Sequence, residues 1–380
     1  MVAYVIVNGG EDHIGLRGTS MGRNGSDYKA VTLKEVAASA GVSLITASRA
    51  LRTPQVVSEQ MRDRVFAAVD ALGYTPNQAA RALASARSSI IGIIVPSVTN
   101  LVFTDVMRGL YDAIEATDFQ VQLGNSRYTT QKEEKLLRVF AAQRPAGLIV
   151  AGTDQSPTAR SILEQLGCPV VQIMDLSANP IDMMIGFDHL EGGRTATRHL
   201  LEMGYRKIGF MGARMDPRAQ RRLQGYRETL QQAGLSDERL VITTPQPSSV
   251  SLGGQMLADF LITAPDVDAV FCNNDDIAMG ALFECQRRGI RVPTQFGIMG
   301  FNDLEYAGSI APSLSTIRTH RYETGYKAVE MVMSANAGER PPSAIINMGF
   351  ELVARQSTDR QAGERLAIPD TASAHLRSIS

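Results

Sequence analysis

The sequence predicts an all-α helix-turn-helix unit followed by a larger α/β region of two lobes, in which parallel sheets are covered by helices. Short helical segments separated by capping residues and glycines fill residues 31–75. Over residues 89–358, short apolar runs alternate with amphipathic helical segments, which is typical of βα units. That region is about 270 residues long, more than one such sheet usually needs, so we expect two lobes.

Composition limits the classes of protein to which the chain can belong. It has 380 residues, 44% of them hydrophobic, and a formal net charge of −1, so any DNA-binding surface must be local. The three cysteines lie far apart, which predicts neither a disulfide framework nor a zinc site and fits a reducing cytoplasm. Residues 1–30 are glycine-rich and polar after a short apolar start, and we expect a disordered leader. No apolar run approaches the roughly 20 residues that cross a bilayer, so we expect a cytoplasmic protein with no membrane partner.

Capping signals define the helices of the N-terminal unit. Thr32 and Glu35 have the spacing of a capping box, in which each side chain satisfies the other residue's amide. Gly41 permits a tight turn with positive φ, and Ser43 caps a second helix over residues 44–51. Helix, glycine turn, helix is typical of the helix-turn-helix motif. A three-helix packing unit with no role in DNA binding is the alternative.

The second helix is the one that we expect to read DNA. A third helix, which begins after Ser58 and ends at Gly73, presents an apolar face for packing. In the motif, the N-terminal residues of the second helix meet base edges in the major groove. Residues 31–88 carry seven basic and four acidic side chains, a net charge of +3, which also favours DNA. The side chains expected at the DNA are Thr32, Leu44, Ile45, Thr46, Ser48 and Arg49.

The connector, residues 76–88, has high helix propensity but is short. Isolated helices below about 12–15 residues are marginal in water, so such a segment can become ordered when it docks. Leu83 is one large apolar side chain among alanines. It can insert between base steps in the minor groove and bend the duplex. The alternative is an ordinary linker, with Leu83 packed on the next domain.

The α/β region is expected to hold a ligand at the carboxyl ends of its strands. The apolar runs are 90–95, 121–123, 148–150, 170–173, 208–211, 269–272 and 297–300. The helical segments between them include 106–116, 131–142, 192–203, 221–233 and 277–288. The polar residues that follow the runs include Ser97, Asn125, Asp175, 273–276, Asn302 and Asp303. Converging amides and carboxylates suit a hydroxyl-rich ligand, although each of them can instead cap a helix.

Three arginines lie just before or at the start of one predicted helix and can clamp an acid group: Arg218, Arg221 and Arg222. Within residues 89–358 no Gly-x-Ser-x-Gly, His-Glu-x-x-His or Walker sequence is present, and the five histidines of the chain lack metal-ligand spacing. We therefore expect a binding site and no enzyme, cofactor or metal.

The order of these parts resembles the LacI/GalR family of bacterial repressors over about residues 31–358. The most specific stretches are VTLKEVA (31–37), GVS (41–43), SRAL (48–51), GYTPN (73–77), RALA (81–84), NDDIAMG (274–280) and GFND (300–303). Within the family the chain is most similar to the gluconate operon repressors. That likeness lies in residues 97–103, 174–175, 185–188, 212–214 and 271–276.

The resemblance implies a hinge helix at 77–84 that inserts Leu83 into a palindromic operator, with Asn77 and Arg81 also at the DNA. It implies a homodimer and an effector domain of two lobes of periplasmic-binding-protein type. The implied N-lobe is about 89–187 and 320–348, the C-lobe is about 188–317 and 349–358, and a disordered tail follows at 359–380. The implied effector contacts are Phe103, Asp175, Phe187, Arg222, Asn274 and Asn302. Many relatives have an aspartate at position 302, whereas an amide also donates, which suits a ligand with an acid group.

These expectations describe a sequence-specific transcriptional repressor whose operator affinity is set by a sugar acid, with gluconate as inducer. Another sugar or sugar acid such as 2-ketogluconate, or a corepressor, is the alternative. A solute-binding protein would need an export signal and no helix-turn-helix unit. A sugar-modifying enzyme would need a base or nucleophile in the cleft. The tail lacks leucine heptads, so a dimer is expected and a tetramer is not.

Overall fold

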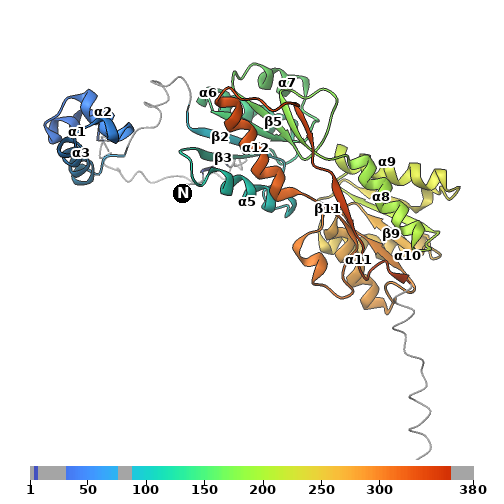
Figure 1. Ribbon diagram of the computed structural model, residues 1–380. Coiled ribbons are helices and arrows are strands. Elements are labelled where there is room, and N and C mark those ends of the chain that lie inside the picture. Colours follow the sequence, from blue (N-terminus) through green and yellow to red (C-terminus); the bar gives the residue numbers. More distant parts are fainter. Residues whose placement is uncertain (1–3, 7–30, 76–87, 361–380) are drawn as a thin grey trace, which may run out of the picture. The chain divides into compact units, whose positions relative to one another are not determined.

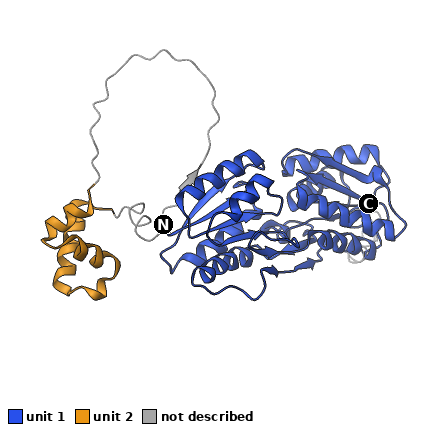
Figure 2. Cartoon of the chain, turned by 90° about the horizontal axis from the view of Figure 1, so that it is seen from above, with its two compact units in different colours: residues 1–6, 89–380 blue, residues 7–88 orange. Residues whose placement is uncertain are grey.

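The computed structural model of the protein describes residues 4–6, 31–75 and 88–360. The chain divides into two compact units, one spanning residues 7–88 and the other made of residues 1–6 and 89–380 (Figure 2). Each unit has its own buried apolar core. None of the helices within these described ranges is long and apolar enough to cross a membrane.

The smaller unit is the predicted helix-turn-helix unit. It contains α1 (Leu33–Ala40), α2 (Leu44–Arg52), a 3-10 helix (Pro54–Val56) and α3 (Glu59–Leu72). The capping box is formed: the Glu35 amide lies 3.4 Å from Thr32 Oγ1, and the Thr32 amide lies 2.7 Å from the Glu35 carboxylate. Gly41 and Gly73 follow α1 and α3 with φ of 62° and 60°, which ends each helix where the sequence predicts.

Small side chains set the packing of these helices. Ala37, Ala47 and Ala50 are buried together with Val36 and Val65. Alanine lets helix axes approach closely, so α2 lies against its neighbours on one face and leaves the other face exposed.

A seven-stranded parallel sheet forms the N-lobe of the larger unit, with strand order β1-β3-β2-β4-β5-β6-β12. The strands are β1 (Tyr4–Ile6), β2 (Ile90–Val95), β3 (Gln120–Asn125), β4 (Gly147–Ala151), β5 (Val170–Ile173), β6 (Met183–Gly186) and β12 (Ile345–Asn347). The helices are α5 (Val102–Ile114), α6 (Thr130–Gln143), α7 (Pro157–Glu164) and α12 (Arg321–Asn336) (Figure 1). Ile91 and Ile93 pack with α5 and α12, whereas Ile94 packs with α6 and α7, so helices cover both faces.

Strand β1 differs from the prediction of a disordered leader over residues 1–30. It pairs in parallel with β3, from Tyr4 opposite Gln122 to Ile6 opposite Gly124. An edge strand exposes unpaired backbone groups, which lets a short apolar segment add to the sheet. The rest of the predicted leader, the hinge residues Asn77, Arg81 and Leu83, and the tail after residue 360 lie outside the described residues.

A four-stranded parallel sheet forms the C-lobe, with strand order β10-β9-β7-β8. The strands are β7 (Ile208–Ala213), β8 (Val241–Thr244), β9 (Ala269–Cys272) and β10 (Gly297–Met299). The helices are α8 (His189–Glu202), α9 (Pro217–Gln232), α10 (Val250–Thr263) and α11 (Asp275–Arg288), with short 3-10 helices at Glu238–Leu240 and Glu305–Gly308. One buried cluster joins the sheet to α8 and α9 and another joins it to α10 and α11, so both faces are covered.

The two lobes are joined by three passages of the chain, which follow β6, β11 (Thr316–Thr319) and β12. After the third passage, β13 (Phe350–Val353) pairs antiparallel with β11 (Figure 1). Residues that follow strands of both sheets line a common cleft. The predicted two-lobed α/β fold is therefore confirmed, and the edge at which the sequence predicts ligand binding is the one where the strands of both lobes end.

Candidate functional site

The outer face of α2 exposes two large apolar side chains. Leu44 and Ile45, at the start of the helix, are 51% and 65% exposed. Ser43 caps the helix, with its Oγ 3.1 Å from the Thr46 amide and 2.8 Å from the Thr46 hydroxyl. Exposed aliphatic groups at this position can contact a thymine methyl group, and the exposed Arg49 can reach a guanine or a phosphate.

Two other side chains expected at the DNA are Thr32, which is exposed but engaged in capping, and Ser48. The Thr32 hydroxyl donates to the Glu35 carboxylate at 2.9 Å, so helix capping is sufficient to account for a threonine at this position. Ser48 is half-buried on α2. The DNA-binding assignment of the unit therefore depends chiefly on Leu44, Ile45 and Arg49.

An inner chamber of about 60 Å³ lies between the lobes where the strands end. Four of the six predicted effector contacts line it: Phe103, Arg222, Asn274 and Asn302. Phe103 comes from α5 of the N-lobe, and the other three come from α9 and the strand ends of the C-lobe. The fold thus brings together four of the predicted residues, which lie far apart in the sequence.

Arg222 is a buried cation on the wall of this chamber, with a relative exposure of 9%. Its Nε donates to His189 Nδ1 at 3.2 Å and its Nη1 donates to the Asn273 carbonyl at 2.5 Å. The guanidinium lies 3.8 Å from the centroid of the Phe301 ring. Within residues 88–360, no carboxylate forms an ion pair with it, and burial lowers the pKa of Arg222 to about 10.

The other two arginines of α9 do have carboxylate partners. Arg218 pairs with Asp216 at 2.8 Å. Although burial alone would raise the pKa of Asp216, Arg218 and the Ala219 amide hold it below its ordinary value. Arg221 pairs with Asp175 of the N-lobe, so this ion pair crosses between the lobes.

The other two predicted effector contacts, Asp175 and Phe187, do not line the inner chamber. The Asp175 carboxylate is 1% exposed and accepts hydrogen bonds from Thr153 Oγ1 at 2.9 Å and the Leu176 amide at 2.8 Å, besides Arg221. Phe187 is buried, with its ring centroid 4.1 Å from that of His189. Their polar and apolar contacts are already satisfied by neighbours, so they support the wall of the chamber.

The two asparagines of the chamber differ in how their side chains are used. Asn274 caps α11, because its Oδ1 accepts from the Ile277 amide at 3.1 Å, and its Nδ2 donates to Ser248 at 2.6 Å. Asn302 has φ of 116°, a conformation that non-glycine residues rarely adopt and that is concentrated at functional sites. In the described part of the chain no hydrogen bond to its side-chain amide is found, so this amide can both donate to a ligand and accept from it.

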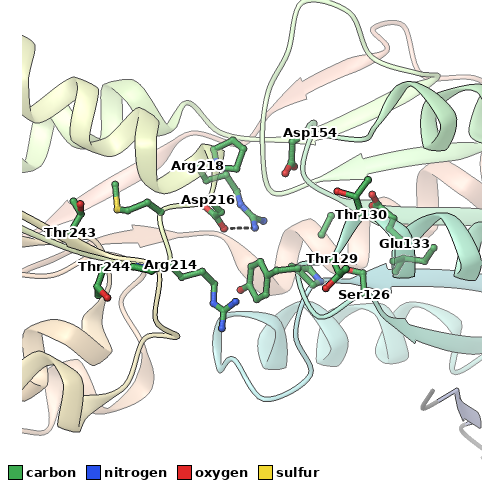
Figure 3. Close-up of a pocket in the computed structure, with 17 residues that line it drawn as sticks. Ser126, Thr129, Thr130, Glu133, Asp154, Arg214, Asp216, Arg218, Thr243 and Thr244 are labelled. Carbon is green, nitrogen blue, oxygen red and sulfur yellow. Dashed lines mark hydrogen bonds and ion pairs between the residues drawn. The ribbon is translucent and has the colours of Figure 1, made fainter. Parts of the chain in front are cut away.

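A second, larger chamber of about 580 Å³ opens beside the first. Figure 3 shows Glu133 and Asp154 of the N-lobe on one side, and Asp216, Arg218 and Arg214 of the C-lobe on the other. The Arg214 guanidinium lies 4.1 Å from the Tyr128 ring centroid, and this pair lines both chambers. Burial, with Asp154 nearby, raises the pKa of Glu133 to about 7.

His189 is one residue of the inner chamber that the sequence analysis missed. Its five histidines were considered only as metal ligands, and none has that spacing. His189 lies three residues after β6, the same kind of position as the other predicted site residues, so its place after a strand was the available signal. Tyr128 was also missed, although it lies three residues after β3, in a loop where its backbone is left-handed with φ of 56°.

Comparisons with known proteins agree with this arrangement. The model for bacterial regulatory proteins of the lacI family matches residues 32–77, and the model for a periplasmic binding protein-like domain matches residues 197–358. The HTH-type transcriptional regulator GntR of Pseudomonas aeruginosa is 43% identical over 327 residues, which cover 86% of this chain and 95% of that protein.

Two solved structures extend the comparison to the fold. A transcriptional regulator of the LacI family from Silicibacter pomeroyi is 37% identical, with a TM-score of 0.82 over 87% of this chain and all of that one. The transcription regulator GntR from Chromobacterium violaceum is 39% identical, with a TM-score of 0.69 over 71% of this chain and 99% of that one. With its helix-turn-helix unit and its two-lobed cleft, the chain belongs to the LacI family of bacterial regulatory proteins.

Proposed function

We propose that this regulator is a cytoplasmic repressor that binds a palindromic operator as a homodimer and is released from it by a sugar acid, gluconate. The observation that carries the ligand class is Arg222, a buried guanidinium whose protein partners, His189 and the Asn273 carbonyl, are both neutral. The likeness to gluconate operon repressors and to relatives named GntR supports gluconate.

A ligand carboxylate would supply the counter-charge that Arg222 lacks. Burying a cation among neutral groups is costly, and the lowered pKa of Arg222 reflects that cost. A hydrogen bond between charged groups contributes about 1.5–3 kcal/mol, more than a neutral one. Arg218 and Arg221 are already paired with Asp216 and Asp175, so an acid gains most at Arg222.

The neighbouring side chains suit the hydroxyl groups of a sugar acid. The Asn302 amide offers a donor and an acceptor, and Ser248 and Asn274 add further polar atoms to the wall. Phe103 supplies an apolar surface for the carbon backbone of the ligand. The chamber therefore matches a small molecule that carries one anionic end and several hydroxyls.

The volume of the inner chamber links ligand binding to movement. A space of about 60 Å³ holds a few water molecules and is too small for a six-carbon acid. Gluconate can enter only if side chains or lobes shift, and the two lobes both contribute to the wall. A coupling free energy of about 1–3 kcal/mol would change operator affinity by about 5–150-fold.

Calorimetric titration of the full chain with gluconate, 2-ketogluconate and ribose tests the ligand class. We expect an acid, gluconate, to bind and the neutral sugar ribose to give no heat. Tighter binding of 2-ketogluconate would retain the class and change the named effector. Binding of ribose with an affinity equal to that of gluconate, or no binding of either acid, would contradict the proposal.

A further inference from the structure

We propose that His189 is a positioning residue that connects the effector-binding guanidinium of Arg222 in the C-lobe to the Met174 carbonyl in the N-lobe. This inference rests on the proposed function for the identity of the effector, but not for the geometry of the connection. It assigns the transmission between lobes to one buried side chain of the larger unit.

The connection consists of two hydrogen bonds through one imidazole ring. Arg222 Nε donates to His189 Nδ1 at 3.2 Å, and His189 Nε2 lies 2.8 Å from the Met174 carbonyl oxygen. Arg222 Nε is always a donor and a carbonyl oxygen is always an acceptor. The ring must therefore accept at Nδ1 and carry its proton at Nε2, which fixes both the tautomer and the orientation.

The surroundings hold this ring in its neutral form. His189 is buried at the start of α8, and its ring packs 4.1 Å from Phe187 and 6.1 Å from Phe301, centroid to centroid. Burial, followed by the positive charge of Arg222, places the pKa of His189 well below its ordinary value. A proton on Nδ1 would face the Arg222 donor, so the hydrogen-bonded chain excludes the imidazolium.

The acceptor end of the connection lies at a constrained point of the N-lobe. Met174 follows β5 directly and has φ of 69°, a left-handed conformation that non-glycine residues adopt rarely. Its amide donates to the Ile185 carbonyl at 3.0 Å, which ties it to β6. A displacement of His189 is therefore transmitted to the carboxyl ends of β5 and β6 in the N-lobe sheet.

Two neighbouring arginines thus reach two neighbouring residues by different routes. Arg221 pairs directly with Asp175, whereas Arg222 reaches Met174 only through His189. The direct pair does not involve the inner chamber, since neither Arg221 nor Asp175 lines it. All three residues of the route through His189 line the inner chamber, so a ligand bound to Arg222 acts on this route and not on the direct pair.

Interlobe distances measured by pulsed electron spin resonance test the connection without any ligand. Nitroxide labels are placed at Arg138→Cys on α6 and Gln231→Cys on α9, which are exposed positions in different lobes. Cys168 is changed to serine, while Cys272 and Cys285 are buried and stay in place. The full chain is used, and each variant is first checked for folding by its melting transition.

His189→Gln and His189→Asn are compared with His199→Gln as the matched control. Glutamine can retain the bond to Met174 but not the acceptor for Arg222, and asparagine the reverse. His199 is also buried on α8 and bonds to Thr358 at 2.7 Å, but it lies outside both chambers. We expect both His189 variants to shift or broaden the ligand-free distance distribution and His199→Gln to leave it unchanged.

Operator affinity with and without gluconate is measured on the same variants. We expect the ratio of the two affinities to fall to within about twofold of one for both His189 variants. A wild-type distribution together with a wild-type ratio in both variants would overturn the connection. If gluconate does not change the operator affinity of the wild-type protein, the proposed effector is refuted. The interlobe distances alone then test the connection.

If neither His189 variant folds, nitrogen-15 resonances of the wild-type histidines decide the matter. The connection requires an unprotonated Nδ1 and a slowly exchanging Nε2 proton on His189 across pH 5–8. A proton on Nδ1, or rapid ring titration in that range, would overturn it.

Discussion

Replacement of Arg222 by methionine separates ligand recognition from folding. The change removes the buried guanidinium and keeps a side chain of similar length. In the wild type this cation has two neutral hydrogen-bond partners and a stacked ring, and no carboxylate among the described residues forms an ion pair with it, although Asp216 acts on it at longer range. We expect gluconate affinity to fall by about 10–150-fold, the equivalent of the 1.5–3 kcal/mol that a hydrogen bond between charged groups contributes.

The free energy of unfolding should change little in the same variant. Loss of the two hydrogen bonds costs about 1–2 kcal/mol, but the desolvation cost of an unpaired buried cation is also removed. We therefore expect a net change within about 1 kcal/mol, measured by urea unfolding of the ligand-free protein.

Arg221→Met is the matched control, because Arg221 is the adjacent residue on the same helix. Its removal leaves the Asp175 carboxylate, 1% exposed, without its cation. The expected cost is about 1–3 kcal/mol, less than for a fully buried pair, since the Arg221 side chain is 35% exposed. Unchanged gluconate affinity in Arg222→Met, or a loss of stability equal to that of Arg221→Met, would refute the reasoning.

Three further predictions address the DNA-binding unit, the hinge and the larger chamber. Arg49→Ala on α2 should weaken specific operator binding by about 1–3 kcal/mol in a fluorescence titration at fixed salt; equal binding would remove Arg49 from the interface. Leu83→Ala should weaken binding to the operator far more than to a scrambled duplex, and equal losses would exclude its insertion into the minor groove. Glu133→Gln should be more stable than the wild type at pH 8 and equal to it near pH 4.5. The reason is that the Glu133 pKa is raised from 4.5 to about 7 on folding, so wild-type stability from this group is lost as pH rises through that interval. A stability difference that does not change with pH would contradict this assignment.

The helix-turn-helix unit was predictable almost to the residue, because local chemistry sets its ends. Thr32, Ser43 and the glycines at 41 and 73 act on their own neighbours in the chain, and α1 to α3 begin or end beside them. Strands made of uninterrupted apolar runs were also predictable, and the ranges of β2 and β5 match the predicted ones. The sequence analysis did not find β6, β8 and β11–β13; all of these except β6 include polar residues, which interrupts the apolar run.

The site was predictable in composition but not in connectivity. Asn274, Asn302 and Arg222 were found because the strands of parallel sheets end at a common edge. The sequence cannot tell that Arg221 crosses to Asp175 while the next residue faces the chamber, since both lie on one turn of α9. The same holds for His189, whose partners are 15 and 33 residues away and in different lobes.

The central claim is that a sugar acid controls the affinity of this protein for a specific operator. Fluorescence anisotropy of a palindromic duplex centred on CG, at fixed salt and beside a scrambled duplex, measures this directly. The account predicts tight binding to the palindrome alone, weakened about 5–150-fold by gluconate and unaffected by ribose. Specific binding that gluconate leaves unchanged, after a palindrome selected from random DNA has been used, would contradict it.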